Sequence, residues 1–269
     1  MKNKVIFAFV LLLFLISRIY KIAEIPASVY WDEASIGYNA YSIATDLKDE
    51  WGEKLPLHFR AFGEFKLPVY IYSVAVFVKV FGLNEYAVRL PAVLYSLGTL
   101  IVIYLLTKKI TGKKWVAILA SFILCVSPWF FIFSRTGYEV TAGLFFFLLG
   151  TYIFLLIDKS KYLLPVATVS FLLSFYSYNS FRIIIPIWLA ALFVYRYHDL
   201  GKLKKEWILI FASLLIFILS LIPIYRLYKF DAGGARFAQV EGCSIICDNF
   251  SNGRNVFEGT HKAKLGASR

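Results

Sequence analysis

The sequence predicts an all-α fold, that of a polytopic helical membrane protein, and three observations lead to this fold class. First, 59% of the 269 residues are hydrophobic and only 17% are charged, whereas soluble domains usually carry about 25% charged residues. Second, the hydrophobic residues occur in long blocks, as in membrane-spanning helices. Third, the basic residues behind the formal net charge of +12 fall between these blocks, which is typical of topology signals and not of nucleic-acid binding.

The hydrophobic blocks follow one another along most of the chain. Lys2 and Lys4 precede the first block, and no small-residue cleavage site follows it. We therefore expect an uncleaved anchor with its N-terminus in the cytoplasm. We also expect about seven of the blocks to span the membrane as helices. The blocks lie at 5–20, 68–82, 86–107, 115–133, 140–157, 162–178, 183–195 and 207–225.

The block at 68–82 is expected to lie along the membrane surface. As a helix it would be about 22 Å long, which is shorter than a hydrocarbon core of about 30 Å. Pro68 suits the first turn of a helix and Gly82 its end. If this helix lies flat, the cytoplasmic segments hold twelve lysines and arginines, and if it spans they hold five. Because basic residues favour the cytoplasmic side, we expect residues 21–85 to form one external loop.

A second interfacial helix is expected within this loop, at about residues 33–47. An apolar residue recurs there every three or four positions, as on one face of a helix. These residues are Ile36, Ala40, Ile43 and Leu47. The transmembrane domain would then extend over residues 1–225, with both interfacial helices in its external loop.

Residues 226–269 are expected to form an external polar tail, because they show little hydrophobic periodicity. Cys243 and Cys247 in this tail form a CSIIC pattern that fits no common zinc site. A local disulfide between them is one option outside the cytoplasm. Cys125 lies inside a hydrophobic block and is expected to be a small core residue.

The acidic pair Asp32 and Glu33, in SVYWDEASIGYNAYSI, is the first candidate for chemistry. One carboxylate at the start of a helix could cap its free N–H groups. Capping does not explain two acids beside Trp31 at a membrane surface, where ionisable groups usually need a partner or a function. The alternative is a base or charge stabiliser that faces a polar acceptor.

Other charged residues fall on the same predicted side of the membrane. Lys66 could bind an anionic phosphate or reach to the interface as an ordinary surface lysine. Arg89 could pair with Glu85, and Arg135 with Glu139, because each pair is four residues apart. Arg182 could anchor the chain at the level of the lipid headgroups. The external turns and loop also contribute Glu64 and Tyr178.

Five segments together resemble polyprenyl-phosphate-sugar glycosyltransferases of the GT-C superfamily. The most similar group is the protein O-mannosyltransferases (glycosyltransferase family 39), which are related to the lipid A aminoarabinose transferases. The resemblance covers roughly residues 5–230, and the order of the segments makes it fairly specific. The segments are WDEASIGYNAYSI, GEFKLPVYIYSVAVFVKVFG, NEYAVRLPAVL, SPWFFIFSRTGYEVTAGLFF and SYNSFRIIIPI.

The resemblance implies inverting transfer of a sugar from a dolichyl- or undecaprenyl-type phosphate outside the cytoplasm. Asp32 resembles the catalytic aspartate of the family, and Glu33 resembles its acidic neighbour. Lys66 resembles the lysine that binds the donor phosphate, Glu139 a second acid, and Arg89 an arginine in the RLP segment. Further substrate contacts are expected from Glu64, Arg135, Tyr178 and Arg182.

We therefore expect a membrane glycosyltransferase that moves a sugar, for example mannose, to a protein or lipid hydroxyl group. Its expected partners are the lipid-linked donor, the acceptor and membrane lipids, with no nucleic acid. No cofactor is expected, although an acidic pair could hold a divalent metal ion.

Two alternatives to an active enzyme remain open. Family members have more membrane helices than the seven predicted here, so one alternative is a truncated and inactive form. The other is a transporter or lipid-binding protein, which would be expected to carry acids within its spanning segments. The hydrophobic blocks are nearly free of acids, which disfavours transport.

Overall fold

The structure, a computed structural model, describes residues 2–61, 64–195 and 207–230. The predicted external tail therefore lies outside the described residues from residue 231 onward, and Cys243 and Cys247 lie outside them too. The described residues are mostly helical, in agreement with the predicted all-α class. Their contacts divide the chain into two units, Met1–Phe59 with Lys66–Leu221, and Arg60–Phe65 with Ile222–Arg269.

A short β-hairpin interrupts the helical fold, and the sequence did not predict it. Strand β1 (Phe59–Ala61) pairs with strand β2 (Glu64–Lys66) in a two-stranded sheet. Each strand has three residues, fewer than the four to eight over which alternation can be recognised. The second unit contains most of this hairpin and the last turns of α11 (Trp207–Phe230).

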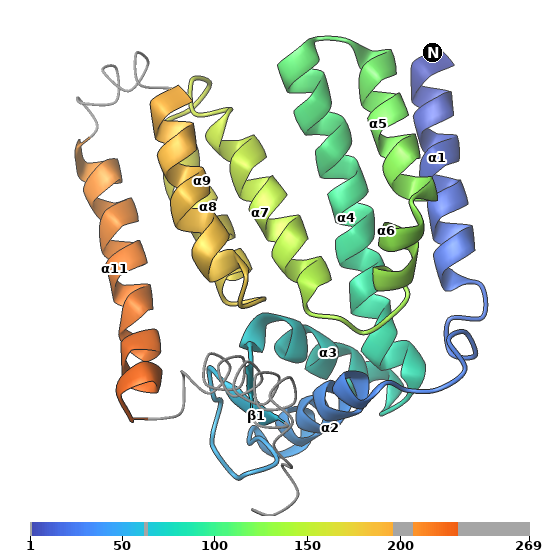
Figure 1. The fold of residues 1–269 in the computed structure, drawn as a ribbon, viewed down its shortest axis with the longest axis vertical. Coiled ribbons are helices and arrows are strands. Elements are labelled where there is room, and N and C mark those ends of the chain that lie inside the picture. Colours follow the sequence, from blue (N-terminus) through green and yellow to red (C-terminus); the bar gives the residue numbers. More distant parts are fainter. Residues whose placement is uncertain (1, 62–63, 196–206, 231–269) are drawn as a thin grey trace, which may run out of the picture. The chain divides into compact units, whose positions relative to one another are not determined.

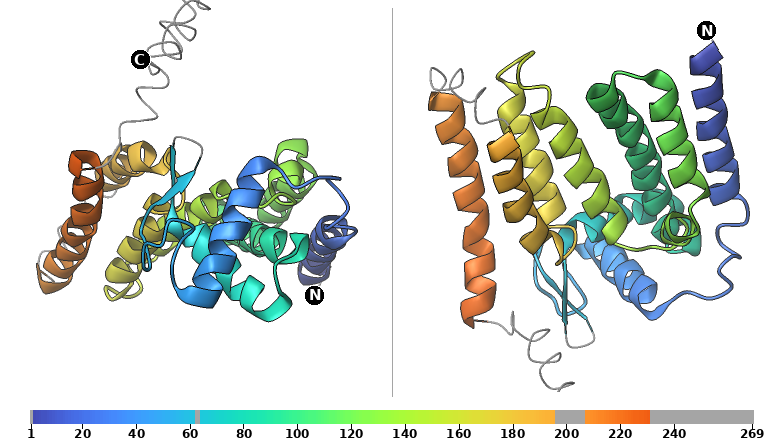
Figure 2. Two further views of the ribbon diagram at one scale, coloured as in Figure 1. Left: turned by 90° about the horizontal axis from the view of Figure 1, so that it is seen from below. Right: turned by 45° about the horizontal axis from the view of Figure 1, so that its top comes forward.

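The larger unit contains a row of helices that run alongside one another (Figures 1 and 2). Helix α4 contacts α1, α5 and α7, and α7 also contacts α8. The short helix α6 follows α5 after a break at Ser127, because Pro128 has no N–H to continue the α5 ladder. The helices of the row are α1 (Lys2–Ile19), α4 (Glu85–Thr111), α5 (Lys114–Val126), α7 (Val140–Phe154), α8 (Leu163–Phe175) and α9 (Phe181–Tyr195), and α6 comprises Pro128–Phe133.

Two further helices, α2 (Trp31–Asp46) and α3 (Pro68–Phe81), run across one end of this row. Ile36, Ala40 and Ile43 of α2 are buried against α3 in one hydrophobic cluster. Leu47 does not join them, although the spacing placed it on the same face. It lies beyond the helix in a left-handed conformation (φ 56°) and is 50% exposed.

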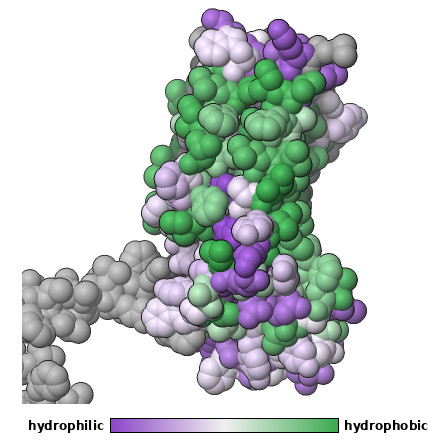
Figure 3. Space-filling model, turned by 90° about the vertical axis from the view of Figure 1, so that its right-hand side faces the viewer, coloured by the Kyte–Doolittle hydropathy of each residue, from purple (hydrophilic) through white to green (hydrophobic). Residues whose placement is uncertain are grey.

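Helix α4 alone among the described helices is long and hydrophobic enough to cross a membrane by itself. Several other hydrophobic helices, such as α5 and α7, have 13 to 15 residues, and a helix of that length covers about 20 Å. The expected number of seven spanning helices therefore stays a prediction. On the face that contains α1, a broad hydrophobic band separates two hydrophilic ends (Figure 3).

Candidate active site

The candidate site lies where the first turn of α2 meets three segments that are distant in sequence. These segments are the end of β2, the start of α4, and the turn at 134–139 that leads into α7. Gly137 of this turn lies close against α4: a Cβ atom on Gly137 would approach Val88 Cγ1 to 2.8 Å. The two acids of the pair face different partners in this site.

Asp32 forms an ion pair with Lys66. The Lys66 Nζ lies 2.5 Å from Asp32 Oδ1 and 3.9 Å from Glu139 Oε1. The lysine is buried, with a side chain 5% exposed, while those of Asp32 and Glu139 are 14% and 11% exposed. The structure thus brings together three residues that the sequence analysis selected, and it leaves the Asp32 carboxylate partly open to solvent.

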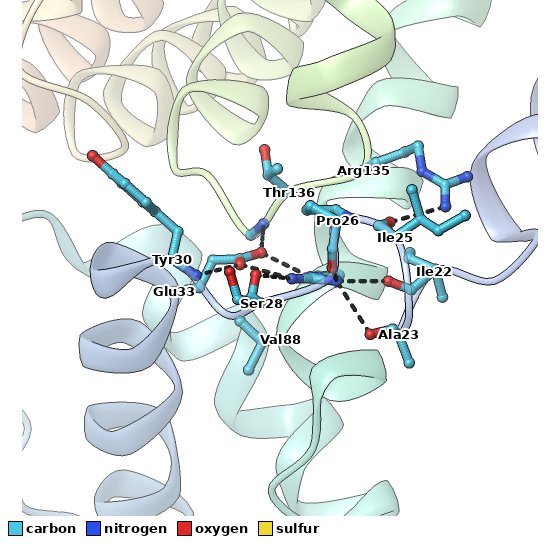
Figure 4. Close-up of polar contacts among 12 residues, drawn as sticks. Ile22, Ala23, Ile25, Pro26, Ser28, Tyr30, Glu33, Val88, Arg135 and Thr136 are labelled. Carbon is cyan, nitrogen blue, oxygen red and sulfur yellow. Dashed lines mark hydrogen bonds and ion pairs between the residues drawn. The ribbon is translucent and has the colours of Figure 1, made fainter.

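Glu33 is enclosed by N–H donors (Figure 4). Arg89 makes a two-pronged contact, from Nε to Glu33 Oε1 at 2.9 Å and from Nη2 to Oε2 at 3.0 Å. The backbone N–H groups of Gly137 and Tyr30 donate to the same carboxylate at 2.7 and 3.0 Å. The side chains of Glu33 and Arg89 are each 1% exposed. Because a carboxylate offers about four acceptor positions, Glu33 has no position left for a substrate.

The environment of Glu33 keeps this carboxylate charged. Burial raises the pKa of the Glu33 carboxyl, but the hydrogen bonds from Arg89, Gly137 and Tyr30 outweigh burial and hold that pKa below its ordinary value. An acid with a lowered pKa is a weak proton acceptor. This geometry favours Glu33 as a positioning residue at the start of α2, where its acceptance from Tyr30 N–H also caps the helix.

Arg89 and Arg135 hold the connection between α1 and α2, which we call the α1–α2 strap (residues 20–30). Both guanidinium groups donate to backbone carbonyls in or next to this strap (Figure 4). The carbonyl acceptors are Ile22, Pro26 and Ser28 for Arg89, at 2.8 to 3.1 Å, and Ser17, Tyr20 and Ile25 for Arg135, at 2.6 to 3.0 Å.

These contacts correct two local ion pairs that the four-residue spacing had offered as options. Arg89 pairs with Glu33 and not with Glu85: its Nε and Nη2 groups each donate to one oxygen of the buried Glu33 carboxylate. Arg135 donates to strap carbonyls and not to Glu139, because Arg135 lies in a turn, where helical spacing does not apply. All five N–H groups of Arg89 have protein acceptors, so a substrate contact by Arg89 would require these bonds to break.

The remaining predicted substrate contacts lie farther along the chain. Arg182 is partly buried, lies 3.2 Å from His58 Nε2, and stacks over the Phe175 ring at 5.9 Å. Tyr178 is half-buried and interacts electrostatically with Tyr138. The side chain of Glu64 lies outside the described residues.

Sequence reasoning missed Gly137, Tyr138 and the strap carbonyls. A glycine between Arg135 and Glu139 was the available signal for a close backbone approach. The carbonyls gave no signal, since every residue carries one. Within the described part of the chain, no three His, Cys, Asp or Glu side chains are grouped as a metal site.

A cavity of about 440 Å³ lies beside the Glu33–Arg89 pair, between α2 and the start of α4. Most of its wall is hydrophobic, from residues such as Val29, Tyr38 and Leu83.

Comparison with known proteins gives a match at the family level. A protein-family model described as dolichyl-phosphate-mannose-protein mannosyltransferase matches residues 66–231, more than half of the 269 residues. The matched segment contains Lys66, Arg89 and Glu139 and begins after the acidic pair. Searches among curated proteins and among solved structures found no match.

Proposed function

We propose a function from the family to which the chain belongs, that of the dolichyl-phosphate-mannose-protein mannosyltransferases. In this proposal the protein transfers a sugar from a polyprenyl-phosphate donor to a hydroxyl group outside the cytoplasm. The family is one of membrane glycosyltransferases of the GT-C type. The observation that carries the proposal is the Asp32–Lys66 pair, which combines a proton acceptor with a phosphate-binding cation in one partly open site.

In the proposed reaction, an acceptor oxygen forms a bond to the anomeric carbon while the bond from that carbon to the phosphate oxygen breaks. Asp32 accepts the proton of the acceptor hydroxyl, and the polyprenyl phosphate leaves with the electron pair of the broken bond. Lys66 stabilises the charge that develops on this phosphate. Since Lys66 also binds Asp32, an arriving phosphate would compete for the ammonium group and release the carboxylate to act as a base.

Glu33, Arg89 and Arg135 act in this proposal by positioning. They fix the start of α2 and the strap that precedes it, so the Asp32 carboxylate is held in place without direct contact between these three residues and the substrate. Glu139 places a second carboxylate 3.9 Å from the Lys66 Nζ, beside the one that Asp32 provides. Arg182 and Tyr178 remain candidates for donor contacts.

The proposal is tested by incubating membranes that contain the protein with radiolabelled polyprenyl-phosphate mannose and either a serine- and threonine-containing peptide or membrane lipid as acceptor. We expect the label to be transferred to one of these acceptors. In matched membranes that lack the protein, we expect no transfer of label. Absence of transfer to both acceptors would favour an inactive form. Uptake of a solute into vesicles without any transfer would favour a transporter.

The proposed orientation places the N-terminus in the cytoplasm and places α2 and α3 at the outer membrane surface. It is supported by the distribution of basic residues and by the way α2 and α3 run across the helix row. In a variant without the native cysteines, Thr111→Cys should resist an impermeant thiol reagent in intact cells, and Glu53→Cys should react. Labelling of residue 111 from outside would contradict this orientation.

A further inference from the structure

Tyr138 lies in the candidate site and has no role in the reaction proposed above. Its two neighbours in sequence are both fixed: the Gly137 N–H donates to Glu33 at 2.7 Å, and Glu139 lies 3.9 Å from the Lys66 Nζ. The Tyr138 ring packs edge-on against Phe133, with ring centroids 5.4 Å apart. The backbone and the ring are therefore both held, and the side chain is half-buried.

The neighbours of the Tyr138 phenol include acidic residues of the candidate site. It interacts electrostatically with Tyr178, Asp32, Glu139 and Tyr30. Burial, followed by these neighbours, raises the pKa of Tyr138 to about 12. The phenol is thus protonated at physiological pH and can donate a hydrogen bond. Within the part of the chain that the structure describes, its hydroxyl makes no hydrogen bond.

The charge around Tyr138 distinguishes between possible acceptors for this hydrogen bond. Asp32 and Glu139 bring two negative charges, and Lys66 brings one positive charge. Away from Lys66, an anionic acceptor for the phenol would be repelled by the two carboxylates, while an uncharged hydroxyl oxygen would not. The phosphate of a donor would instead lie toward Lys66, and its sugar would lie toward the two acids.

We infer that Tyr138 contacts the sugar being transferred and donates a hydrogen bond to one of its hydroxyl oxygens. This inference rests on the proposed function and adds a residue that determines which sugar is accepted. A site that hydrogen-bonds a substrate hydroxyl discriminates against an analogue that lacks it. Loss of the Tyr138 hydroxyl should remove that discrimination at one position of the sugar ring and leave it unchanged at the others.

The test compares wild type with Tyr138→Phe, which keeps the ring and its packing on Phe133. Each enzyme is assayed with polyprenyl-phosphate mannose and with its monodeoxy analogues, one ring hydroxyl removed at a time. For wild type, we expect kcat/KM to fall by about two- to tenfold on loss of the contacted hydroxyl. For Tyr138→Phe, we expect a similar fall with the full sugar and no further fall with that one analogue. Tyr162→Phe, at a 77% exposed position, is the matched control and should behave as wild type.

The outcomes separate this inference from the proposed function. If wild type transfers mannose and Tyr138→Phe shows the same discrimination across the whole deoxy series, the inference is overturned and the proposed function stands. If wild type transfers no sugar, both are overturned. A merely structural role for Tyr138 would lower kcat/KM for the full sugar and every analogue alike, and that result too would overturn the inference.

Discussion

Replacing Asp32 with asparagine is expected to slow sugar transfer by about two to four orders of magnitude, the range that a positioned base contributes. Asparagine has nearly the same shape as aspartate but cannot accept a proton at neutral pH. Its amide oxygen can still accept a hydrogen bond from Lys66, so the local packing should survive. We therefore expect kcat to fall while the protein remains folded.

The measurement is the initial rate of transfer from labelled polyprenyl-phosphate mannose at saturating donor, with equal amounts of each variant in the membrane. Asp46→Asn is the matched control, because Asp46 is an exposed acid at the opposite end of the same helix. We expect this control to keep the wild-type rate. Equal rates for wild type and Asp32→Asn would remove Asp32 from the role of base.

Replacing Arg89 with leucine is expected to destabilise the protein by about 3 to 5 kcal/mol, the range measured when one partner of a buried ion pair is removed. The variant would leave the Glu33 carboxylate, 1% exposed, without its guanidinium partner. It would also leave strap carbonyls without their donor. Because such a loss is a large share of the stability of most proteins, we expect a poorly folded protein.

This prediction is checked by the apparent unfolding temperature in detergent and by the amount of monodisperse protein recovered. Arg89→Lys provides the graded comparison, because it keeps the charge but not the two-pronged geometry, and it should fall between wild type and Arg89→Leu. An Arg89→Leu protein as stable as wild type would show that the pair is not what holds the start of α2.

The stability contribution of Glu33 should also depend on pH in a defined direction. The pKa of Glu33 is lower in the folded protein than in the unfolded chain. Its contribution is therefore fully present above the ordinary carboxyl pKa, and it is lost as the pH falls through the lowered folded value. Glu33→Gln should flatten this acidic loss, which a series of unfolding temperatures below neutral pH would reveal.

Local patterns in the sequence predicted the extents of helices α2 and α3, while their placement at a membrane surface stays a prediction. The apolar spacing of Ile36, Ala40 and Ile43 placed α2, and Pro68 and Gly82 placed the ends of α3, because these signals act within a few residues. The acidic pair was found for the same reason, since two charges beside Trp31 are conspicuous in a hydrophobic chain. Each of these features can be read without knowledge of the tertiary structure.

The tertiary partners could not be predicted in this way. Glu33 and Arg89 are 56 residues apart, and no local spacing connects them. The four-residue rule instead suggested pairs within one segment, and it failed for Arg135 because that residue lies in a turn. The different partners of Asp32 and Glu33 also depend on tertiary contacts, because Glu33 accepts from the Gly137 N–H and Asp32 from Lys66.

The strap has a consequence for how its sequence can vary. Arg89 and Arg135 donate hydrogen bonds to main-chain oxygens of the strap, and these oxygens are present whatever amino acid occupies each position. Exposed strap positions such as Tyr20 and Ile25 are thus expected to tolerate substitution, whereas Ile22, which is buried in a hydrophobic cluster, and the two arginines are not. A stretch of sequence without a distinctive motif can in this way follow a closely defined backbone path.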